Sequence, residues 1–338
     1  MANLRAGLVG LGMMGRHHAR VIRELEGVDL VAVADSFGDQ HGAADGLKVC
    51  GSVDDLIAQG IDIAVVAVPT NLHEEVAMQL AAAGIHCLVE KPIAADSESG
   101  GRIAAEFERR GLIGAVGHIE RFNPALQSLR KRLESGDLGD VYHISTRRQG
   151  PFPSRIADVG VVKDLATHDI DLTAWLAQSN YVDVMAHTTS RSGREHEDMV
   201  TAIGHLGGGI VTNHIVNWLS PMKERTAIVL GERGAFVADT ISADLTFVEN
   251  GTFQTEWESM AAFRGVSEGS STRFALAKRE PLKMEHEAFR DAVLGKSMNI
   301  VTMAEGLETL RVAEAVLESA RTGAVVTLQV PEREPRRQ

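Results

Sequence analysis

The sequence predicts an α/β fold: a doubly wound parallel sheet, followed by an α+β domain with an open, mostly antiparallel sheet. In the first third of the chain, short apolar runs alternate with stretches of helix formers, which is typical of a parallel sheet covered on both faces. From residue 123 onward, strand-like runs follow one another with short turns between them, which favours antiparallel pairing.

The length of the chain supports two domains. It has 338 residues, of which 44% are hydrophobic, and this is enough for two cores. We expect a first domain at residues 1–122, a second at 123–330 and a polar tail at 331–338.

Charge and composition exclude several classes of protein. The net charge is −12 without a long basic run, which argues against a nucleic-acid partner. No apolar stretch is long enough to span a membrane, and no signal peptide fits the N-terminus. The two cysteines, Cys50 and Cys87, lack metal-ligand spacing and indicate a reducing compartment. We expect a cytoplasmic protein with no membrane partner and no metal.

Apolar periodicity and capping residues place the elements of the first domain. Strands are expected at Ala6–Val9, Leu30–Ala34, Ile63–Val68, His86–Val89 and Ile113–Val116. One helix is expected over Leu72–Ala83, ending at Gly84. Another is expected over Ser97–Arg110, with Asp96 as its N-cap and Gly111 as its stop.

The second domain is expected to begin with a helix over Ala125–Glu134, because Asn123 and Pro124 form an N-cap and first-turn pair. Strands are expected at Val141–Thr146, Val182–Thr188, Thr201–His205, Ile210–Ile215, Ala227–Leu230, Ala235–Ala238 and Leu245–Val248. The proline-containing segment Arg147–Arg155 is expected to be a loop. Two late helices follow, Lys283–Leu294 and Met303–Arg321.

A glycine motif follows the first predicted strand and opens the next helix. Its residues are Gly10, Gly12, Met13, Met14 and Gly15. In this context G-x-G-x-x-G predicts a Rossmann dinucleotide site, in which the second glycine lets a pyrophosphate approach the backbone. The alternative is a glycine-rich turn without a ligand.

Asp35 ends the second predicted strand, twenty residues after Gly15. A carboxylate there binds the ribose hydroxyls and repels a 2′-phosphate, which favours NAD over NADP. The alternative is an aspartate that caps the following turn. After the next two strands come Pro69, Thr70, Asn71 and His73, and then Glu90 and Lys91. Carboxyl ends of parallel strands bind ligands, so we expect these residues to line the cofactor groove, although Lys91 alone would suit a surface position.

Four segments together resemble the Gfo/Idh/MocA family of oxidoreductases. They are the glycine motif, Pro69-Thr-Asn-Leu-His73, Glu90-Lys91-Pro92 and Asp164-Leu-Ala-Thr-His168-Asp-Ile-Asp171, and Glu318–Gly323 is also similar. The resemblance implies that NAD or NADP oxidises or reduces a secondary alcohol of a sugar or cyclitol. It also implies catalytic roles for Lys91, Asp164 and His168, and a homodimer or homotetramer.

The chemistry of these three residues fits such a reaction. Asp164 and His168 are four apart and would share a helix face. Histidine suits the removal of a hydroxyl proton, Asp164 could orient it or hold a substrate hydroxyl, and Lys91 could stabilise charge on the reacting oxygen. The alternative is that Asp164 and His168 form an ion pair on the helix surface. We expect Asp169 and Asp171 to be solvated.

Two further segments, Gly117–Ala125 and Arg147–Arg155, resemble nucleotide-sugar dehydrogenases within the family. Arginine suits a pyrophosphate, so the candidate substrate-binding residues are Arg121, Asn123, Arg147, Arg148 and Arg155. We expect at least one of the arginines to form a structural salt bridge instead. The leading hypothesis is oxidation at C3 of a UDP-linked N-acetylhexosamine. The alternatives are a polyol dehydrogenase, for example of myo-inositol, and an NAD-binding sensor without turnover.

Overall fold

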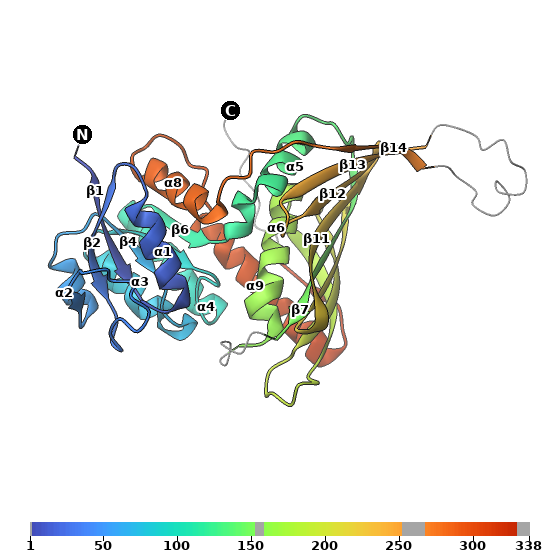
Figure 1. The fold of residues 1–338 in the computed structure, drawn as a ribbon. Coiled ribbons are helices and arrows are strands. Elements are labelled where there is room, and N and C mark those ends of the chain that lie inside the picture. The colour runs from blue at the N-terminus through green and yellow to red at the C-terminus, as the bar shows by residue number, and fades with distance from the viewer. Residues whose placement is uncertain (1, 153–158, 252–267, 330–338) are drawn as a thin grey trace, which may run out of the picture. The chain divides into compact units, whose positions relative to one another are not determined.

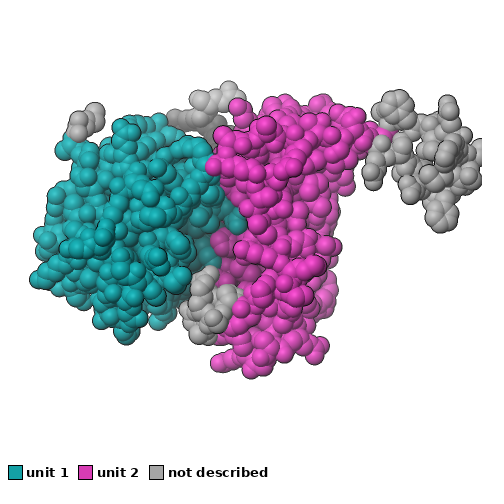
Figure 2. Space-filling view, viewed as in Figure 1, with its two compact units in different colours: residues 1–122, 279–314 teal, residues 123–278, 315–338 magenta. Residues whose placement is uncertain are grey.

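The computed structural model describes residues 2–152, 159–251 and 268–329 (Figure 1). The chain forms two compact units, one of residues 1–122 and 279–314, the other of residues 123–278 and 315–338 (Figure 2). The predicted polar tail and Arg155 lie outside the described residues. Within the described part of the chain, no helix has both the length and the apolar character needed to cross a membrane.

The first unit contains a six-stranded parallel sheet in the order β3-β2-β1-β4-β5-β6. Its strands are β1 (Leu4–Val9), β2 (Val28–Ala34), β3 (Val49–Cys50), β4 (Ile63–Val66), β5 (His86–Glu90) and β6 (Gly114–Gly117). This order reverses direction at β1, so the strand ends on either side of it leave a crevice at the carboxyl edge. The predicted doubly wound sheet is confirmed.

Helices cover both faces of this sheet. One face carries α1 (Met13–Arg23) and α8 (Pro281–Val293). The other carries α2 (Val53–Ile57), α3 (His73–Ala82), α4 (Ser97–Arg110) and the start of α9 (Met303–Thr322). The predicted caps of α4 are confirmed, because the Asp96 carboxylate accepts from Ser99 N at 2.8 Å and Gly111 has a φ of 66°. Two short 3₁₀ turns are η1 (Thr70–Leu72) and η2 (Ile119–Phe122).

The return of the chain to the first unit corrects the predicted domain boundaries. Residues 279–314 do not belong to the second unit. Phe289 and Ala292 of α8 are buried in the core on one face of the parallel sheet, and Met303 and Leu310 of α9 in the core on the other. Their apolar stripes were visible in the sequence, but the surface they cover was not.

The second unit contains a nine-stranded sheet in the order β14-β13-β12-β11-β7-β10-β9-β8-β15. The strands are β7 (Val141–Pro151), β8 (Tyr181–Thr189), β9 (Met199–Leu206), β10 (Val211–Asn217), β11 (Leu219–Gly231), β12 (Gly234–Asp239), β13 (Asp244–Asn250), β14 (Glu268–Arg273) and β15 (Val326–Thr327). Among the described strands of this sheet only the β7–β10 pair is parallel, so the mostly antiparallel sheet is confirmed. Arg147–Pro151 belongs to β7, and the prediction of a loop there is wrong.

One face of this sheet packs against α5 (Pro124–Glu134) and α6 (Thr167–Ala177) (Figure 1). Alternate residues of β7, such as Ile144, point into that core. The opposite face carries exposed apolar side chains, which are Ile203, Val211, Ile228 and Leu230. The α6 helix is preceded by a π-helical turn, η3 (Val162–Ala166).

A buried ion pair holds α6 to β7. Arg148 Nε donates to Asp169 Oδ1 at 3.0 Å, and 3% of each side chain is exposed. Asp171 is also buried. The prediction of solvated carboxylates at Asp169 and Asp171 is therefore wrong. The prediction that at least one arginine forms a structural salt bridge is confirmed.

Replacing Asp169 with Asn should lower the free energy of unfolding by about 3–5 kcal/mol, because the buried Arg148 guanidinium loses the charge of the Asp169 carboxylate. Urea unfolding followed by circular dichroism measures this. The matched control is Glu318→Gln, which breaks an exposed pair with Arg321 and should leave the free energy of unfolding almost unchanged. Equal losses in the two variants would contradict a structural role for the buried pair.

Candidate functional site

The glycine loop between β1 and α1 has the geometry of a dinucleotide site. Gly10 has a φ of 95°, and a Cβ there would lie 2.4 Å from the Ala67 carbonyl oxygen. A Cβ at Gly15 would lie 1.9 Å from the Gly10 carbonyl oxygen. At Gly12, by contrast, nothing lies within 4 Å of an added Cβ. The first and third glycines are thus required by the turn, and the second leaves the backbone open to a ligand.

A pocket of about 370 Å³ lies at the carboxyl ends of β1, β2 and β4. It is lined by the loop from Val9 to Gly12, by residues 34–38, by Gly51–Val53 and by Ala67–Pro69. Of the predicted cofactor residues, Gly10, Gly12, Asp35 and Pro69 line it. Met13, Met14, Gly15, Thr70, Asn71 and His73 do not, and neither do Glu90 and Lys91.

Asp35 lines this pocket and also caps the local turn. Its Oδ2 accepts from Leu11 N at 2.7 Å, and its Oδ1 accepts from Phe37 N at 2.7 Å. Each carboxylate oxygen has a second lone pair, so these bonds are compatible with contacts to a ribose. Phe37 beside it is 83% exposed and also lines the pocket.

His73 is 1% exposed and supports the site from behind. Its Nδ1 lies 2.9 Å from the Pro92 carbonyl oxygen and its Nε2 lies 3.0 Å from that of Val68. Burial lowers the pKa of His73 although both carbonyls favour its protonated form. The imidazole therefore joins the turn after β4 to the turn after β5, and we assign it a positioning role in place of the predicted cofactor contact.

Glu90 and Lys91 lie at the carboxyl end of β5. Glu90 Oε1 is 2.8 Å from His18 Nε2, and its Oε2 accepts from the backbone N–H of Lys91 at 3.1 Å. Burial alone would raise the pKa of Glu90, but the bond and charge of His18 and the charge of Lys91 outweigh it and lower that pKa. Glu90 is thus an ionised support for Lys91, which precedes a cis peptide bond to Pro92.

Asp164 and His168 lie on the helical segment that leads into α6. Asp164 is 8% exposed and belongs to the π-helical turn η3, whereas His168 is partly exposed and is the second residue of α6. A π-helix bonds each N–H five residues back, so the predicted α-helical spacing does not hold across this pair. Such turns occur frequently at functional sites.

The start of this segment is fixed by Glu197, which the sequence did not single out. Glu197 Oε1 accepts from Val162 N at 3.0 Å, and its backbone carbonyl accepts from Val161 N at 3.0 Å. A Cβ at Gly160 would lie 2.0 Å from Glu197 Oε1, so a larger residue there would displace this carboxylate from its bond to Val162 N. The loop between β8 and β9 thereby sets where the helix carrying Asp164 begins.

Two of the arginines predicted to bind the substrate have carboxylate partners in the protein. Arg121 is 7% exposed and donates to Glu305 at 3.1 Å, and Arg148 is paired with Asp169. Arg147 is adjacent to Arg148 on β7 and therefore points to the opposite face of the sheet, away from α6. Its role in binding the substrate stays a prediction. Arg155 lies outside the described residues.

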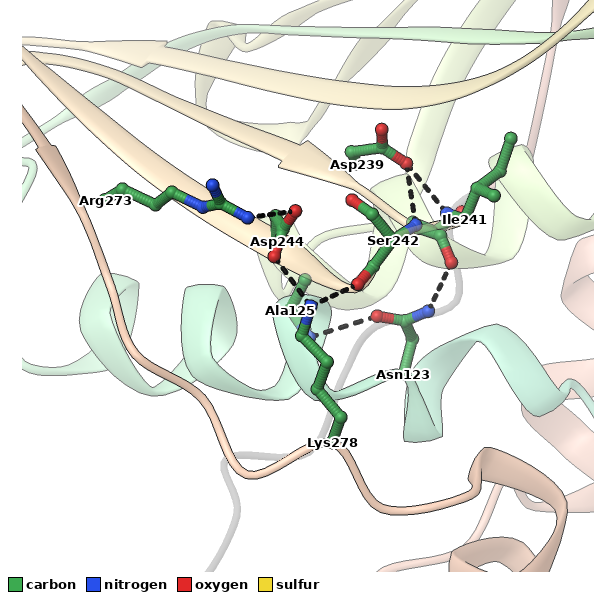
Figure 3. A network of polar contacts seen from close by, with 9 residues as sticks. Asn123, Ala125, Asp239, Ile241, Ser242, Asp244, Arg273 and Lys278 are labelled. Carbon is green, nitrogen blue, oxygen red and sulfur yellow. Dashed lines mark hydrogen bonds and ion pairs between the residues drawn. The ribbon is translucent and has the colours of Figure 1, made fainter.

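Asn123 is committed to the fold. Figure 3 shows its amide between the start of α5 and the turn from β12 to β13. Oδ1 accepts from Ala125 N at 3.0 Å, and Nδ2 donates to the Thr240 carbonyl oxygen at 2.9 Å. Asn123 is 6% exposed. The predicted N-cap is confirmed, and the predicted contact of Asn123 with substrate stays a prediction.

The part of the chain that the structure describes contains no group of three His, Cys, Asp or Glu side chains that could hold a metal ion. The first unit thus carries the glycine loop, the pocket and the strand ends. The second unit carries the η3–α6 segment.

Comparison with known proteins matches both parts of the chain to one family. Residues 4–118 match the Gfo/Idh/MocA model described as an oxidoreductase family with an NAD-binding Rossmann fold. Residues 130–328 match the model of the C-terminal alpha/beta domain of that oxidoreductase family.

Individual relatives are similar over nearly their whole length. UDP-N-acetylglucosamine 3-dehydrogenase of Acidithiobacillus ferrooxidans is 29% identical over 94% of this chain and 96% of its own. Its crystal structure has a TM-score of 0.82. Inositol 2-dehydrogenase 2 of Saccharopolyspora erythraea is 28% identical over 97% of this chain and 96% of its own. The WlbA dehydrogenase of Bordetella pertussis, solved with NADH and UDP-GlcNAcA, is 25% identical, with a TM-score of 0.79 over 97% of this chain and all of that one.

The charge of Asp35 generates a prediction about cofactor choice. NAD(H) should bind at least about tenfold more tightly than NADP(H), about 1.4 kcal/mol, because the carboxylate repels a 2′-phosphate. Fluorescence titration with both dinucleotides measures this. Asp35→Asn keeps the size of the side chain but removes its charge and should narrow the difference. Equal affinities in the unmodified protein would contradict the proposed ribose pocket.

Proposed function

Since this chain belongs to the Gfo/Idh/MocA family of NAD-dependent oxidoreductases, we propose that it oxidises C3 of a UDP-linked N-acetylhexosamine. The full-length similarity to UDP-N-acetylglucosamine 3-dehydrogenase carries this proposal. The similarity to a dehydrogenase solved with NADH and a UDP-sugar supports it. The glycine loop, with open space at Gly12, fits the pyrophosphate of NAD.

We assign the chemistry to Lys91, His168 and Asp164. Bound NAD supplies the hydride acceptor, and the side chains of the protein handle the hydroxyl group. His168 takes the hydroxyl proton as general base, and the Lys91 ammonium donates a hydrogen bond to the reacting oxygen as it gains charge. Asp164 orients the imidazole or holds a neighbouring hydroxyl. The support of Lys91 by Glu90, and of the η3 turn by Glu197, favours fixed positions for these groups.

Polyol oxidation is the second candidate, because inositol dehydrogenases match the chain over a comparable length. The arginine argument for a nucleotide sugar is weaker than the sequence suggested, since Arg121 and Arg148 have carboxylate partners and Arg147 faces away from α6. Arg155 remains the arginine that we propose for a substrate phosphate. The choice between the two substrate classes therefore rests on the relatives.

The substrate is tested by turnover. Purified protein should reduce NAD with UDP-N-acetylglucosamine and should ignore N-acetylglucosamine and myo-inositol at equal concentration. Binding energy from the nucleotide positions the sugar ring, so truncated substrates should lose turnover. Mass spectrometry of the products, with a keto acid present to reoxidise tightly held NADH, is the second readout. Oxidation of inositol without any binding of UDP-sugars would overturn the nucleotide-sugar proposal but not the dehydrogenase.

The catalytic assignment is tested by substitution. Lys91→Met and His168→Ala should each lower kcat about a hundredfold or more, with NAD(H) affinity largely preserved. Steady-state kinetics and NADH titration measure the two quantities. Lys131→Met and His205→Ala change exposed residues of the same types and should leave kcat unaltered. Near-normal turnover in either test variant would remove that residue from the mechanism.

A further inference from the structure

Two buried histidines and the largely buried carboxylate of Glu90 form a hydrogen-bonded chain that ends beside Lys91 in the first unit. His286 of α8 and His18 of α1 are in contact, with 2.8 Å between His286 Nε2 and His18 Nδ1. His18 Nε2 is in turn 2.8 Å from Glu90 Oε1, and Glu90 Oε2 accepts from Lys91 N. The two histidines are 3% and 0% exposed, respectively. The chain joins residues that are 268 and 72 positions apart in the sequence.

Proton accounting fixes the direction of the bond between His18 and Glu90. A carboxylate only accepts, so His18 Nε2 must carry a hydrogen. The 2.8 Å contact between the rings holds one further hydrogen, shared by His18 Nδ1 and His286 Nε2. Burial, together with His18, keeps the pKa of His286 well below its ordinary value, so His286 is neutral. Whichever ring donates in this contact, His286 holds the His18 ring with its Nε2–H directed at Glu90.

Glu90, at the end of this hydrogen-bonded chain, has little room to rearrange. A Cβ at Gly117 would lie 3.2 Å from Glu90 Oε2, and 12% of the Glu90 side chain is exposed. Without the His18 N–H, burial would favour the protonated form of Glu90. A protonated Glu90 would lose its negative charge beside the Lys91 ammonium. It would also accept less strongly from the Lys91 backbone N–H.

We propose that His286 is a positioning residue for Lys91 and acts on it through His18 and Glu90. This inference rests on the catalytic role proposed for Lys91. His286 touches neither the glycine loop nor the pocket among the described contacts, so its effect is on the rate and not on cofactor affinity.

The test is a pair of substitutions at His286. His286→Leu cannot bond to His18 and should lower kcat about tenfold, with the KM for NAD changed less than about twofold. His286→Gln places an amide near the position of Nε2 and should recover most of that loss. Phe289→Leu, one turn further along α8 and in the same core, is the control for packing: it should lower the melting temperature but not kcat. Full kcat in His286→Leu, or no recovery in His286→Gln, would overturn the proposal.

A double-substitution cycle separates this inference from the role of Lys91. If His286 acts through Lys91, adding His286→Leu to Lys91→Met should lower kcat by less than about twofold, because the effects of coupled residues do not add. A full further tenfold loss would show that His286 acts elsewhere and would overturn the inference. Normal turnover of Lys91→Met alone would instead overturn the catalytic assignment.

Discussion

Each unit of this protein contains a carboxylate that is largely removed from water and that fixes the packing of its neighbours. It is Glu90 in the first unit and Asp169 in the second. A buried charge is costly unless it finds a counter-charge or several hydrogen bonds, so each carboxylate fixes the elements that supply its partners. Glu90 joins the end of β5 to α1. Asp169 joins α6 to β7. Both lie next to a proposed catalytic residue, since Glu90 precedes Lys91 and Asp169 follows His168. The positions of the reactive groups therefore depend on how the neighbouring charges are neutralised.

Local signals in the sequence predicted much of the fold. The α4 helix has the expected bounds because Asp96 and Gly111 act within one turn of its ends. The glycine loop could also be predicted, since its steric requirements involve neighbouring residues of the β1–α1 loop and the residues that follow β4. The surface against which an apolar helix face packs could not be predicted from the sequence. The α8 helix is amphipathic wherever it packs, and only the folded chain shows that it covers the parallel sheet.

For the predicted site residues, too, the sequence did not show which partners each side chain contacts. Arg147 and Arg148 looked equivalent while their segment was interpreted as a loop. On a strand, adjacent side chains point to opposite faces, so only one of them can reach α6. Asn123 fitted two roles, and its bonds to Ala125 and Thr240 show the structural one. The partners of Glu90 could not be found from spacing, because His18 lies 72 residues away.

Because Asp164 lies in the π-helical turn at Val162–Ala166, the direction of its side chain depends on the number of residues in that turn. An α-helix advances about 100° per residue, so a single inserted or deleted residue rotates everything before it by roughly that angle. A relative that lacked one residue in this turn could keep the aspartate and still point it elsewhere. Comparisons within the family therefore need to align the length of this turn as well as the identity of its residues.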